Sequence, residues 1–372
     1  MSMQQEGTPK ATGSVRWWIV WTLFFSTVTN YISRQSFSVL SPMIVKQYHF
    51  SHAELGSILG SFQMAYGITW LVGGFILDAV GTRIGLTIAA IWWSLMNILT
   101  GTAHTVFGFA FFRFMLGVGE GFNWPGASKT VAEWFPRQER SLAVAIFDSG
   151  SSVGGAVAAL GMPLLALKVG WRWAFVCSGA LGFVWVALWL TIYHPLDKHP
   201  RVKQEELQHI ERGRDAAERS PDQGLQKWLK LLRNRNVWGV VLGRSLTDPI
   251  WWFYVFWLPQ YLSDARGFSL KQIALSAWIP FVAADIGNFA GGWLSGYCVR
   301  RGFSVWKARI SICVVSCLPM LVGIPVAKVH DPYWALALIS IALFGFASWS
   351  TMGPDVAFGP VSAGCRRHGH RA

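Results

Sequence analysis

The stretch that decides the fold is Gly74-Phe-Ile-Leu-Asp78-Ala-Val-Gly81-Thr-Arg83. It places an acidic, a small and a basic residue at fixed spacing, where one long apolar segment ends and the next begins. In isolation such a pattern would be weak evidence. Here it follows the second of about ten apolar segments that are long enough to cross a lipid bilayer. Its position therefore indicates a loop that joins two membrane helices.

The composition excludes an ordinary soluble protein. The chain is 52% hydrophobic and only 14% charged, with a mean hydropathy of +0.36, whereas a typical soluble domain has about 25% charged residues. A soluble protein of this length could not bury so many uninterrupted apolar segments. The 22 Trp residues also suit a membrane protein, because Trp concentrates at the two membrane–water interfaces. We therefore predict an all-α integral membrane protein with the lipid bilayer as its partner.

The apolar segments form a group of six and a group of four, separated by a polar stretch. The predicted spans are 15–42, 53–78, 86–103, 106–132, 141–167, 172–193, 237–262, 272–298, 307–327 and 332–352. The predicted domains are a cytoplasmic tail at 1–14, a six-helix half at 15–193, a cytoplasmic linker at 194–235, a second half of four spans at 237–352 and an aberrant basic tail at 353–372. We expect the linker to form short helices along the membrane surface.

The basic residues predict the orientation. The net charge is +13, and the Lys and Arg residues lie mainly in loops. If the helices alternate in direction, Arg83, Arg140, the linker and Arg301 all fall on one side. Cytoplasmic loops carry an excess of Lys and Arg, so this side and the N-terminus are predicted to be cytoplasmic. The same rule accounts for the basic charge without nucleic acid, and we expect no nucleic-acid partner.

Ionisable residues inside membrane spans are costly and usually functional. Those in the interior of the predicted spans, away from the span ends, are Arg34, Arg113, Glu120, Asp148, Arg244, Asp248 and Asp285. Arg113 and Glu120 lie two helical turns apart and so share a face. A buried Arg presents a planar cation suited to a carboxylate, and an acid in such a site can load and release a proton. The pair fits proton-coupled import of an organic anion; the alternative is an ion pair that only holds helices together.

Small and aromatic residues flank these charges. Gly117, Gly119 and Gly121 surround Glu120 and would let neighbouring backbones approach closely. The Ser- and Gly-rich segment 149–155 predicts either close packing or hydroxyl groups offered to a sugar, and the sequence does not separate these readings. Four aromatic residues occur within 251–257. At this spacing some must face lipid, so we expect only one or two to stack on a sugar ring.

The chain resembles the major facilitator superfamily and, within it, the anion:cation symporter family. Besides the loop at 74–83, the resemblance is carried by Asn30-Tyr31-Ile-Ser-Arg34, Arg113 to Glu120, Glu133-Trp-Phe-Pro-Arg-Gln-Glu-Arg140-Ser, Phe147-Asp-Ser-Gly-Ser-Ser and Trp257-Leu-Pro-Gln-Tyr-Leu. Stretches at 233–239, 248–249 and 277–285 are similar to the hexuronate (galacturonate and glucuronate) transporters in particular. The resemblance implies two pseudo-symmetric six-helix halves, the second reduced here to four helices, and symport of a hexuronate or related sugar acid with protons by alternating access.

Residue roles follow from the motifs and the resemblance together. The predicted substrate-binding residues are Tyr31, Arg34, Tyr66, Arg113, Asn123, Ser151, Trp252 and Asn288. Glu120 is the predicted proton-coupling residue. In the related galactonate carriers an Asp that takes part in coupling precedes the first-span Arg, and here Ser33 stands in its place, so coupling would depend on Glu120 alone. The predicted gating residues, which can pair with an eleventh span or cap helix ends, are Gly74, Asp78, Gly81 and Arg83.

Two rival readings remain. One is a symporter for another organic anion, such as galactonate, glucarate or a phthalate-like acid. The other is an inactive, truncated carrier, because the sequence after Met352 is rich in Gly, Arg and His, as a frameshifted reading frame would be. The sequence shows neither a nucleophile paired with a base nor a cluster of metal ligands, so we do not expect an enzyme. The five Cys residues lack the spacing of a disulfide or a zinc site. We expect no cofactor and no metal, and a monomer in a bacterial inner membrane.

Overall fold

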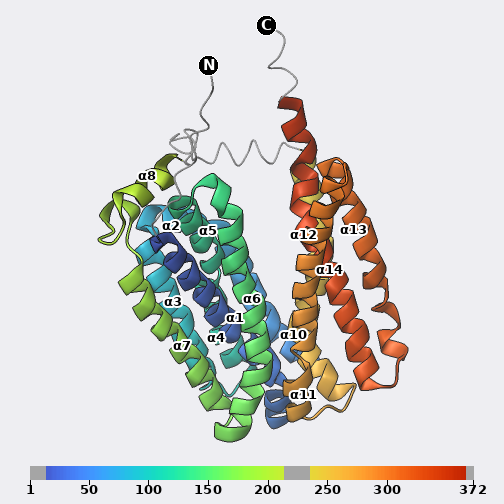
Figure 1. Cartoon of the computed structure of the whole chain (residues 1–372). Coiled ribbons are helices and arrows are strands. Elements are labelled where there is room, and N and C mark those ends of the chain that lie inside the picture. Colours follow the sequence, from blue (N-terminus) through green and yellow to red (C-terminus); the bar gives the residue numbers. More distant parts are fainter. Residues whose placement is uncertain (1–13, 213–234, 366–372) are drawn as a thin grey trace, which may run out of the picture. The chain divides into compact units, whose positions relative to one another are not determined.

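The computed structural model describes residues 14–212 and 235–365, and these residues form helices joined by short loops, with no strand among them. The described chain divides into two compact units, whose helices are labelled in Figure 1. The first unit comprises 14–33, 50–154 and 172–212, and the second comprises 34–49, 155–171 and 235–365. Two long helices, α1 and α6, therefore contribute their first parts to one unit and their second parts to the other.

The first unit is built from the helices of the N-terminal region. They are α1 (Val15–Tyr48), α2 (His52–Val80), α3 (Thr82–Thr100), α4 (Val106–Glu120), α5 (Asn123–Trp134), α6 (Arg137–Val169), α7 (Trp171–Ile192), a 3₁₀ turn (Leu196–Lys198) and α8 (Gln204–Arg212). Within this unit α2 packs against α4 and α5, and α3 packs against α4. The short α8 lies in the predicted linker, where surface helices are expected.

The second unit contains the remaining helices and the second parts of α1 and α6. The helices are α10 (Arg235–Asp264), α11 (Leu270–Ser276), α12 (Ile279–Arg300), α13 (Val305–Leu321), a 3₁₀ turn (Ile324–Lys328) and α14 (Pro332–Cys365). α14 packs against α10, α12 and α13. A buried cluster around Leu262, Ile273, Ala284, Ala335 and Leu343 joins α10, α11, α12 and α14.

Several helices begin at polar caps that the sequence supplies. Ser51 and Glu54 form a capping box at the start of α2, and Ser269 and Gln272 form another at the start of α11. In a capping box the two side chains bond to backbone N–H groups that the first helical turn leaves without partners. These caps fix the points at which the chain re-enters a helix after a loop.

Two predicted spans are each divided into two helices. The span predicted at 106–132 is α4 followed by α5, and the span predicted at 272–298 is α11 followed by α12. Proline explains both breaks, because it lacks the backbone N–H that would donate a hydrogen bond to the carbonyl four residues earlier. Pro125 cannot bond to Gly121, where α4 ends, and Pro280 cannot bond to Ser276, the last residue of α11.

The last predicted span is longer than expected. The backbone of α14 stays helical beyond Met352, as far as Cys365, so part of the predicted basic tail continues this helix. Residues 366–372, 1–13 and 213–234 lie outside the described residues, and the predictions for both tails and for most of the linker fall partly or wholly there.

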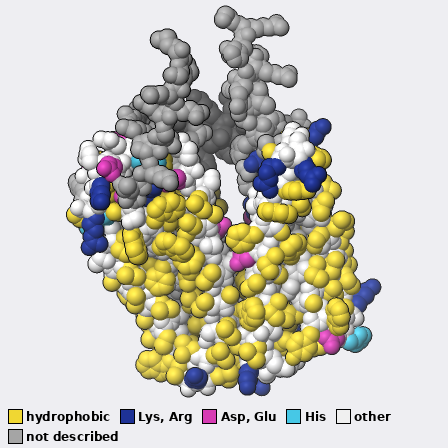
Figure 2. All heavy atoms as spheres, in the orientation of Figure 1, with side chains coloured by type: hydrophobic (Ala, Val, Ile, Leu, Met, Phe, Trp, Pro, Cys, Tyr) yellow, Lys and Arg dark blue, Asp and Glu magenta, His cyan; other side chains and the backbone are white. Residues whose placement is uncertain are grey.

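Membrane character is visible in the described helices. Seven helical segments are long and apolar enough to cross a membrane: His52–Val80, Thr82–Thr100, Gln138–Val169, Trp171–Ile192, Leu270–Arg300, Trp306–Lys328 and Pro332–Thr351. Figure 2 shows hydrophobic side chains covering the flanks of the helices, with Lys and Arg gathered near the helix ends. The helices α1, α4 and α10 are outside this set. α4 has only 15 residues, and α1 carries a run of buried polar residues from Ser33 to Ser36, with buried Asn30 one turn earlier.

Candidate functional site

The loop at 78–83 is a set of contacts inside the first unit. Gly81 joins α2 to α3 with φ of +87°, a conformation that residues with a side chain rarely adopt. The Lys129 ammonium donates to the Asp78 carboxylate at 2.6 Å and to the Leu77 carbonyl at 3.0 Å. Arg83 donates to the Leu190 carbonyl at 2.7 Å, in the last turn of α7. The loop thus connects α2 and α3 to α5 and α7.

A second group of polar contacts continues this loop cluster. Glu133 on α5 accepts hydrogen bonds from Thr82 at 3.3 Å and from the Tyr193 hydroxyl at 2.9 Å. Burial and the neighbouring Glu133 carboxylate raise the pKa of Tyr193, so this hydroxyl stays protonated and acts as the donor. Gly74 is outside the cluster, and a Cβ there would meet nothing within 4 Å. The gating role of these residues stays a prediction.

Arg113 and Glu120 are both 0% exposed on α4. The Arg113 guanidinium lies 4.6 Å from the centroid of the Phe62 ring on α2, an arrangement in which the ring face attracts the cation. The fold therefore encloses a full positive charge and a carboxyl group in one short helix, as the sequence predicts.

The glycines around Glu120 do allow close packing. A Cβ at Gly117 would lie 2.5 Å from the Phe62 carbonyl oxygen, and one at Gly121 would lie 2.6 Å from the Thr69 Cβ. A Cβ at Gly119 would lie 2.8 Å from Trp92. α4 therefore approaches α2 on one side and α3 on the other, and this proximity holds Glu120 in place.

The structure places four other predicted residues in the first unit. Asn123 is 1% exposed, accepts from Ser26 at 2.6 Å and donates to Thr27 at 3.4 Å. Its amide therefore joins α5 to α1, a structural role that the sequence did not suggest. Tyr31 and Tyr66 are half-buried, and Ser151 is half-buried on α6.

The aromatic neighbours of two of these residues are defined. The Tyr66 ring stacks between Phe62, at a centroid distance of 5.7 Å, and Trp70, at 6.4 Å. Tyr31 is adjacent to Gly154, where an added Cβ would lie 2.8 Å from the Tyr31 Cβ. The Gly-rich face of α6 thus packs against α1 in this unit, which is one of the two readings that the sequence left open.

Arg34, Trp252 and Asn288 lie in the second unit. Arg34 is 0% exposed, and its guanidinium lies 5.6 Å from the centroid of the Trp252 ring on α10. The Trp252 ring stacks on Phe256 at 5.6 Å. Asn288 on α12 is exposed and accepts a hydrogen bond from Thr351 at 2.8 Å. The unit therefore brings a buried cation and an indole ring together.

Hydrogen bonds fix the second part of α1 against α10. Ser38 donates to the Phe256 carbonyl at 2.5 Å, and Ser41 donates to the Gln260 side chain at 3.1 Å. The Gln260 amide in turn donates to Asp264 at 2.8 Å. These bonds begin one helical turn after Arg34 and hold the helix that carries it.

Two basic side chains have partners that the sequence did not predict. Arg244 donates to Asp248 at 3.2 Å and to the Ser350 hydroxyl at 2.7 Å, which joins α10 to α14. Lys129, inside a predicted span, pairs with Asp78. Its position as a basic residue inside a predicted apolar span was the signal that could have identified it.

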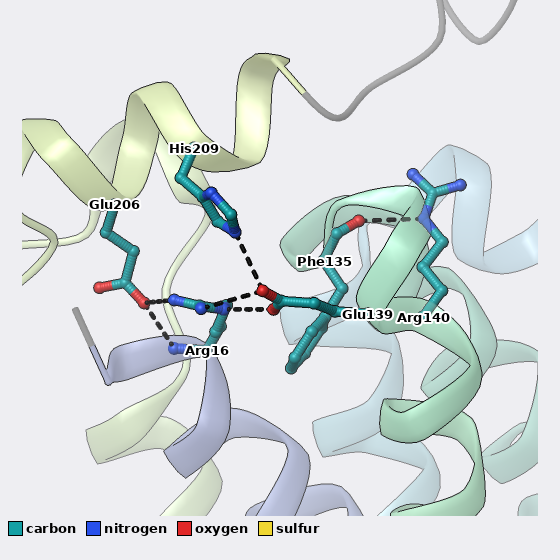
Figure 3. Close-up of polar contacts among 6 residues, drawn as sticks. All are labelled: Arg16, Phe135, Glu139, Arg140, Glu206 and His209. Atoms are coloured by element: carbon teal, nitrogen blue, oxygen red, sulfur yellow. Dashed lines mark hydrogen bonds and ion pairs between the residues drawn. The ribbon is translucent and has the colours of Figure 1, made fainter. Parts of the chain in front are cut away.

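A further charge cluster attaches α8 to the ends of α1 and α6 (Figure 3). Arg16 donates from Nε to Glu139 at 2.8 Å and from Nη1 to Glu206 at 3.0 Å. His209 on α8 contacts Glu139 at 3.0 Å. The side chains of Arg16 and Glu206 are 5% and 0% exposed. No sequence motif signalled this cluster, because Arg16 and Glu206 lie 190 positions apart.

Metal chemistry receives no support from the described residues. Within 14–212 and 235–365, no group of three or more His, Cys, Asp or Glu side chains is arranged to hold a metal ion.

Comparison with known proteins identifies the family. The family model described as Major Facilitator Superfamily matches residues 23–370. The chain is 34% identical to a galacturonate transporter of Dickeya chrysanthemi, over 88% of this chain and 95% of the relative. It is 32% identical to the hexuronate transporter of Escherichia coli K12, over 91% of this chain and 78% of the relative. A probable L-galactonate transporter of the same organism is 33% identical, over 90% and 75%.

Solved structures show the same fold. A bacterial homologue of the human lysosomal transporter Spinster matches with a TM-score of 0.73 at 18% identity, over 94% of this chain and 76% of that one. The xylose transporter XylE from E. coli matches with a TM-score of 0.64 at 18% identity, over 93% and 84%. The family and the relatives are transporters rather than enzymes. The chain is a multi-pass membrane protein and belongs to the major facilitator superfamily.

Proposed function

We propose that this transporter imports a hexuronate, or a closely related sugar acid, together with protons. The observation that carries the proposal is the fully buried Arg34 beside the Trp252 ring. A membrane protein keeps an enclosed guanidinium only at considerable cost, and a planar cation next to an aromatic face suits a ligand with a carboxylate and a sugar ring. Relatives that are named as galacturonate and hexuronate transporters support the same substrate class.

Each residue receives a role in this proposal. Arg34 would hold the substrate carboxylate, and Trp252 would stack on the sugar ring. Arg113 is a second fixed cation for the anion. The hydroxyl groups of the substrate would bond to Tyr31, Tyr66, Ser151 and Asn288, whereas both ends of the Asn123 amide already bond to α1.

Glu120 is the residue that we assign to proton coupling. It is a fully buried carboxyl group on the same helix as Arg113, and a buried acid can take up and release a proton during the transport cycle. A Gln at this position would mimic the protonated acid permanently. Substrate exchange would then remain, whereas accumulation driven by a proton gradient would be lost.

The membrane placement follows from the family and the charge distribution. We infer a monomer in a bacterial inner membrane. We also infer a cytoplasmic N-terminus, because the basic loops lie on one side of the membrane if the helices alternate in direction. Residues 78–83 would then lie at the cytoplasmic face, where the pairing of Asp78 with Lys129 would stabilise one conformation of the transport cycle.

A second candidate substrate has specific support. Relatives named as probable L-galactonate and galactarate/D-glucarate transporters match at 33% and 32% identity. These acids share a carboxylate and a row of hydroxyl groups with hexuronates, so the same residues could bind them.

The test is uptake by the purified chain in liposomes. With an acidic exterior, labelled galacturonate or glucuronate should accumulate against its gradient, and a protonophore should abolish the accumulation. Galactonate and glucarate added as competitors separate the two substrate candidates. Glu120→Gln should exchange substrate without accumulating it. Glu54→Gln is the matched control, because Glu54 is exposed and Gln also completes a capping box. Failure to take up any of these acids would overturn the proposed function.

A further inference from the structure

Gln35 on α1 is an anomaly among the buried polar residues of the second unit. The side chain is only 1% exposed. Neither its Oε1 nor its Nε2 has a hydrogen-bond partner among the described residues. Buried amides in proteins nearly always bond to something, and each exception requires an explanation. A long, flexible side chain left in this state keeps both ends of its amide available to a partner that the described residues do not supply.

The neighbouring polar residues make the contrast clear. Ser38 and Ser41, one and two helical turns further on, bond to α10 and so have structural partners. Gln260, buried to a similar extent at 3% exposure, uses both ends of its amide, accepting from Ser41 and donating to Asp264. The fold therefore satisfies an amide where its role is structural, and it leaves the Gln35 amide open.

The position of Gln35 suggests which ligand could supply hydrogen bonds to its amide. It directly follows Arg34, whose guanidinium is fully buried beside Trp252. It is also four residues after Tyr31, so these two side chains share one face of α1. A single ordered water could bond to the amide, but a buried water needs two to four polar partners. A polyhydroxylated acid offers many such groups at once.

We propose that Gln35 recognises the arrangement of hydroxyl groups on the transported sugar acid by hydrogen bonding. Its Oε1 would accept from one substrate hydroxyl, and its Nε2 would donate to a second hydroxyl or a carboxylate oxygen, next to the charge of Arg34. This inference depends on the proposed function. It adds a specificity residue, because an amide has a fixed donor and a fixed acceptor, whereas the Arg34 cation attracts any carboxylate.

The test exchanges the amide for a thioether of similar length. Gln35→Met removes no hydrogen bond to the residues that the structure describes, so the thermal midpoint of the ligand-free protein should stay the same or rise. The KM for the preferred sugar acid should rise about tenfold, as expected for the loss of one or two hydrogen bonds. The ratio of kcat/KM for galacturonate and glucuronate, which differ in one hydroxyl configuration, should move towards one.

Gln260→Met is the matched control, because the same substitution there removes bonds to Ser41 and Asp264. It should lower the ligand-free thermal midpoint and leave the substrate ratio unchanged. Gln35→Glu is a second variant of the same shape, and its negative charge should raise the KM for an anion more than Met does.

Three results would overturn the inference. Gln35→Met could keep the parent KM and substrate ratio, or it could lower the ligand-free midpoint as Gln260→Met does while leaving the KM unchanged. Gln35→Glu could transport with the parent KM. If the unmodified chain takes up none of the sugar acids, the proposed function and this inference both fail. If it takes them up and the Gln35 variants match it, this inference alone fails.

Discussion

At the scale of single residues, Arg34 is the position where burial, charge and geometry agree. The guanidinium is 0% exposed and lies beside Trp252. Arg34→Ala should reduce kcat/KM for sugar-acid uptake at least about 100-fold, because a buried charge contact to the substrate is lost. Arg34→Lys should restore little, since an ammonium cannot make the two parallel bonds of a guanidinium. Uptake is measured in cells with membrane expression determined in parallel.

Arg301→Ala is the matched control for Arg34. Arg301 also lies over an aromatic ring, 5.1 Å from the centroid of Tyr297, but it is exposed at the end of α12. This variant should transport normally. Near-parental uptake by Arg34→Ala would remove Arg34 from the substrate site.

Candidate site residues could be singled out from the sequence, but the side chains that contact them could not. A lone Arg or Glu in an apolar segment is conspicuous, which is how Arg34, Arg113 and Glu120 were singled out. The Asp78–Lys129 pair and the amide contacts of Asn123 depend on which helices lie next to each other. Spacing along one helix determines which face a residue occupies and leaves the neighbouring helix undefined.

At the scale of helices, the close approach of α4 to α2 predicts opposite effects for two similar substitutions. Gly117→Ala places a Cβ 2.5 Å from the Phe62 carbonyl oxygen. Backbone cannot move aside as a side chain can, so the overpacking should destabilise the protein by about 1–3 kcal/mol. The measurement is the thermal midpoint of the purified protein in detergent.

The control for this prediction is Gly60→Ala on α2. A Cβ at Gly60 meets nothing within 4 Å, and Ala favours the helix by about 1 kcal/mol relative to Gly. Its thermal midpoint should stay level or rise. If both variants behave alike, the contact of α4 with α2 does not constrain position 117.

The attachment of α8 provides a second prediction at this scale. Glu206→Gln removes a charge that is 0% exposed and breaks the ion pair of Arg16 with Glu206. Breaking a buried pair costs about 3–5 kcal/mol, so the thermal midpoint should fall and protease should cleave near α8 more readily. Glu211→Gln, an exposed position on the same helix, should do neither. Equal protease resistance in the two variants would show that Arg16 does not hold α8.

Helix boundaries illustrate where the sequence alone falls short. Hydrophobicity predicted single spans at 106–132 and 272–298, yet each is two helices. Pro125 and Pro280 were visible, but Pro42 and Pro163 lie inside unbroken helices. A missing N–H weakens a helix wherever it occurs, and packing decides whether the helix bends or ends.

At the scale of the whole molecule, the family and the all-helical fold followed from the sequence, whereas the membrane assignment of individual helices was less direct. Composition was sufficient for a helical membrane protein, because apolar segments of spanning length separated by basic loops have few alternatives. The family followed from the resemblance carried by the loop at 74–83 and the other motifs. α1 is the instructive case. Its run of buried polar residues from Ser33 to Ser36 lowers the hydrophobic signal of the helix that carries the predicted substrate cation.

The orientation in the membrane can be tested with two exposed positions, one in the first turn of α11 and one just after α12. In a background with the native Cys residues replaced by Ser, Lys271→Cys precedes α12 and Arg301→Cys follows it. A helix that crosses the bilayer places these positions on opposite sides, and the basic Arg300–Arg301 end should be cytoplasmic. An impermeant maleimide should therefore label Lys271→Cys in intact cells and Arg301→Cys only after permeabilisation. The reverse pattern would place the N-terminus outside, and labelling of both positions in intact cells would mean that α12 does not span the membrane.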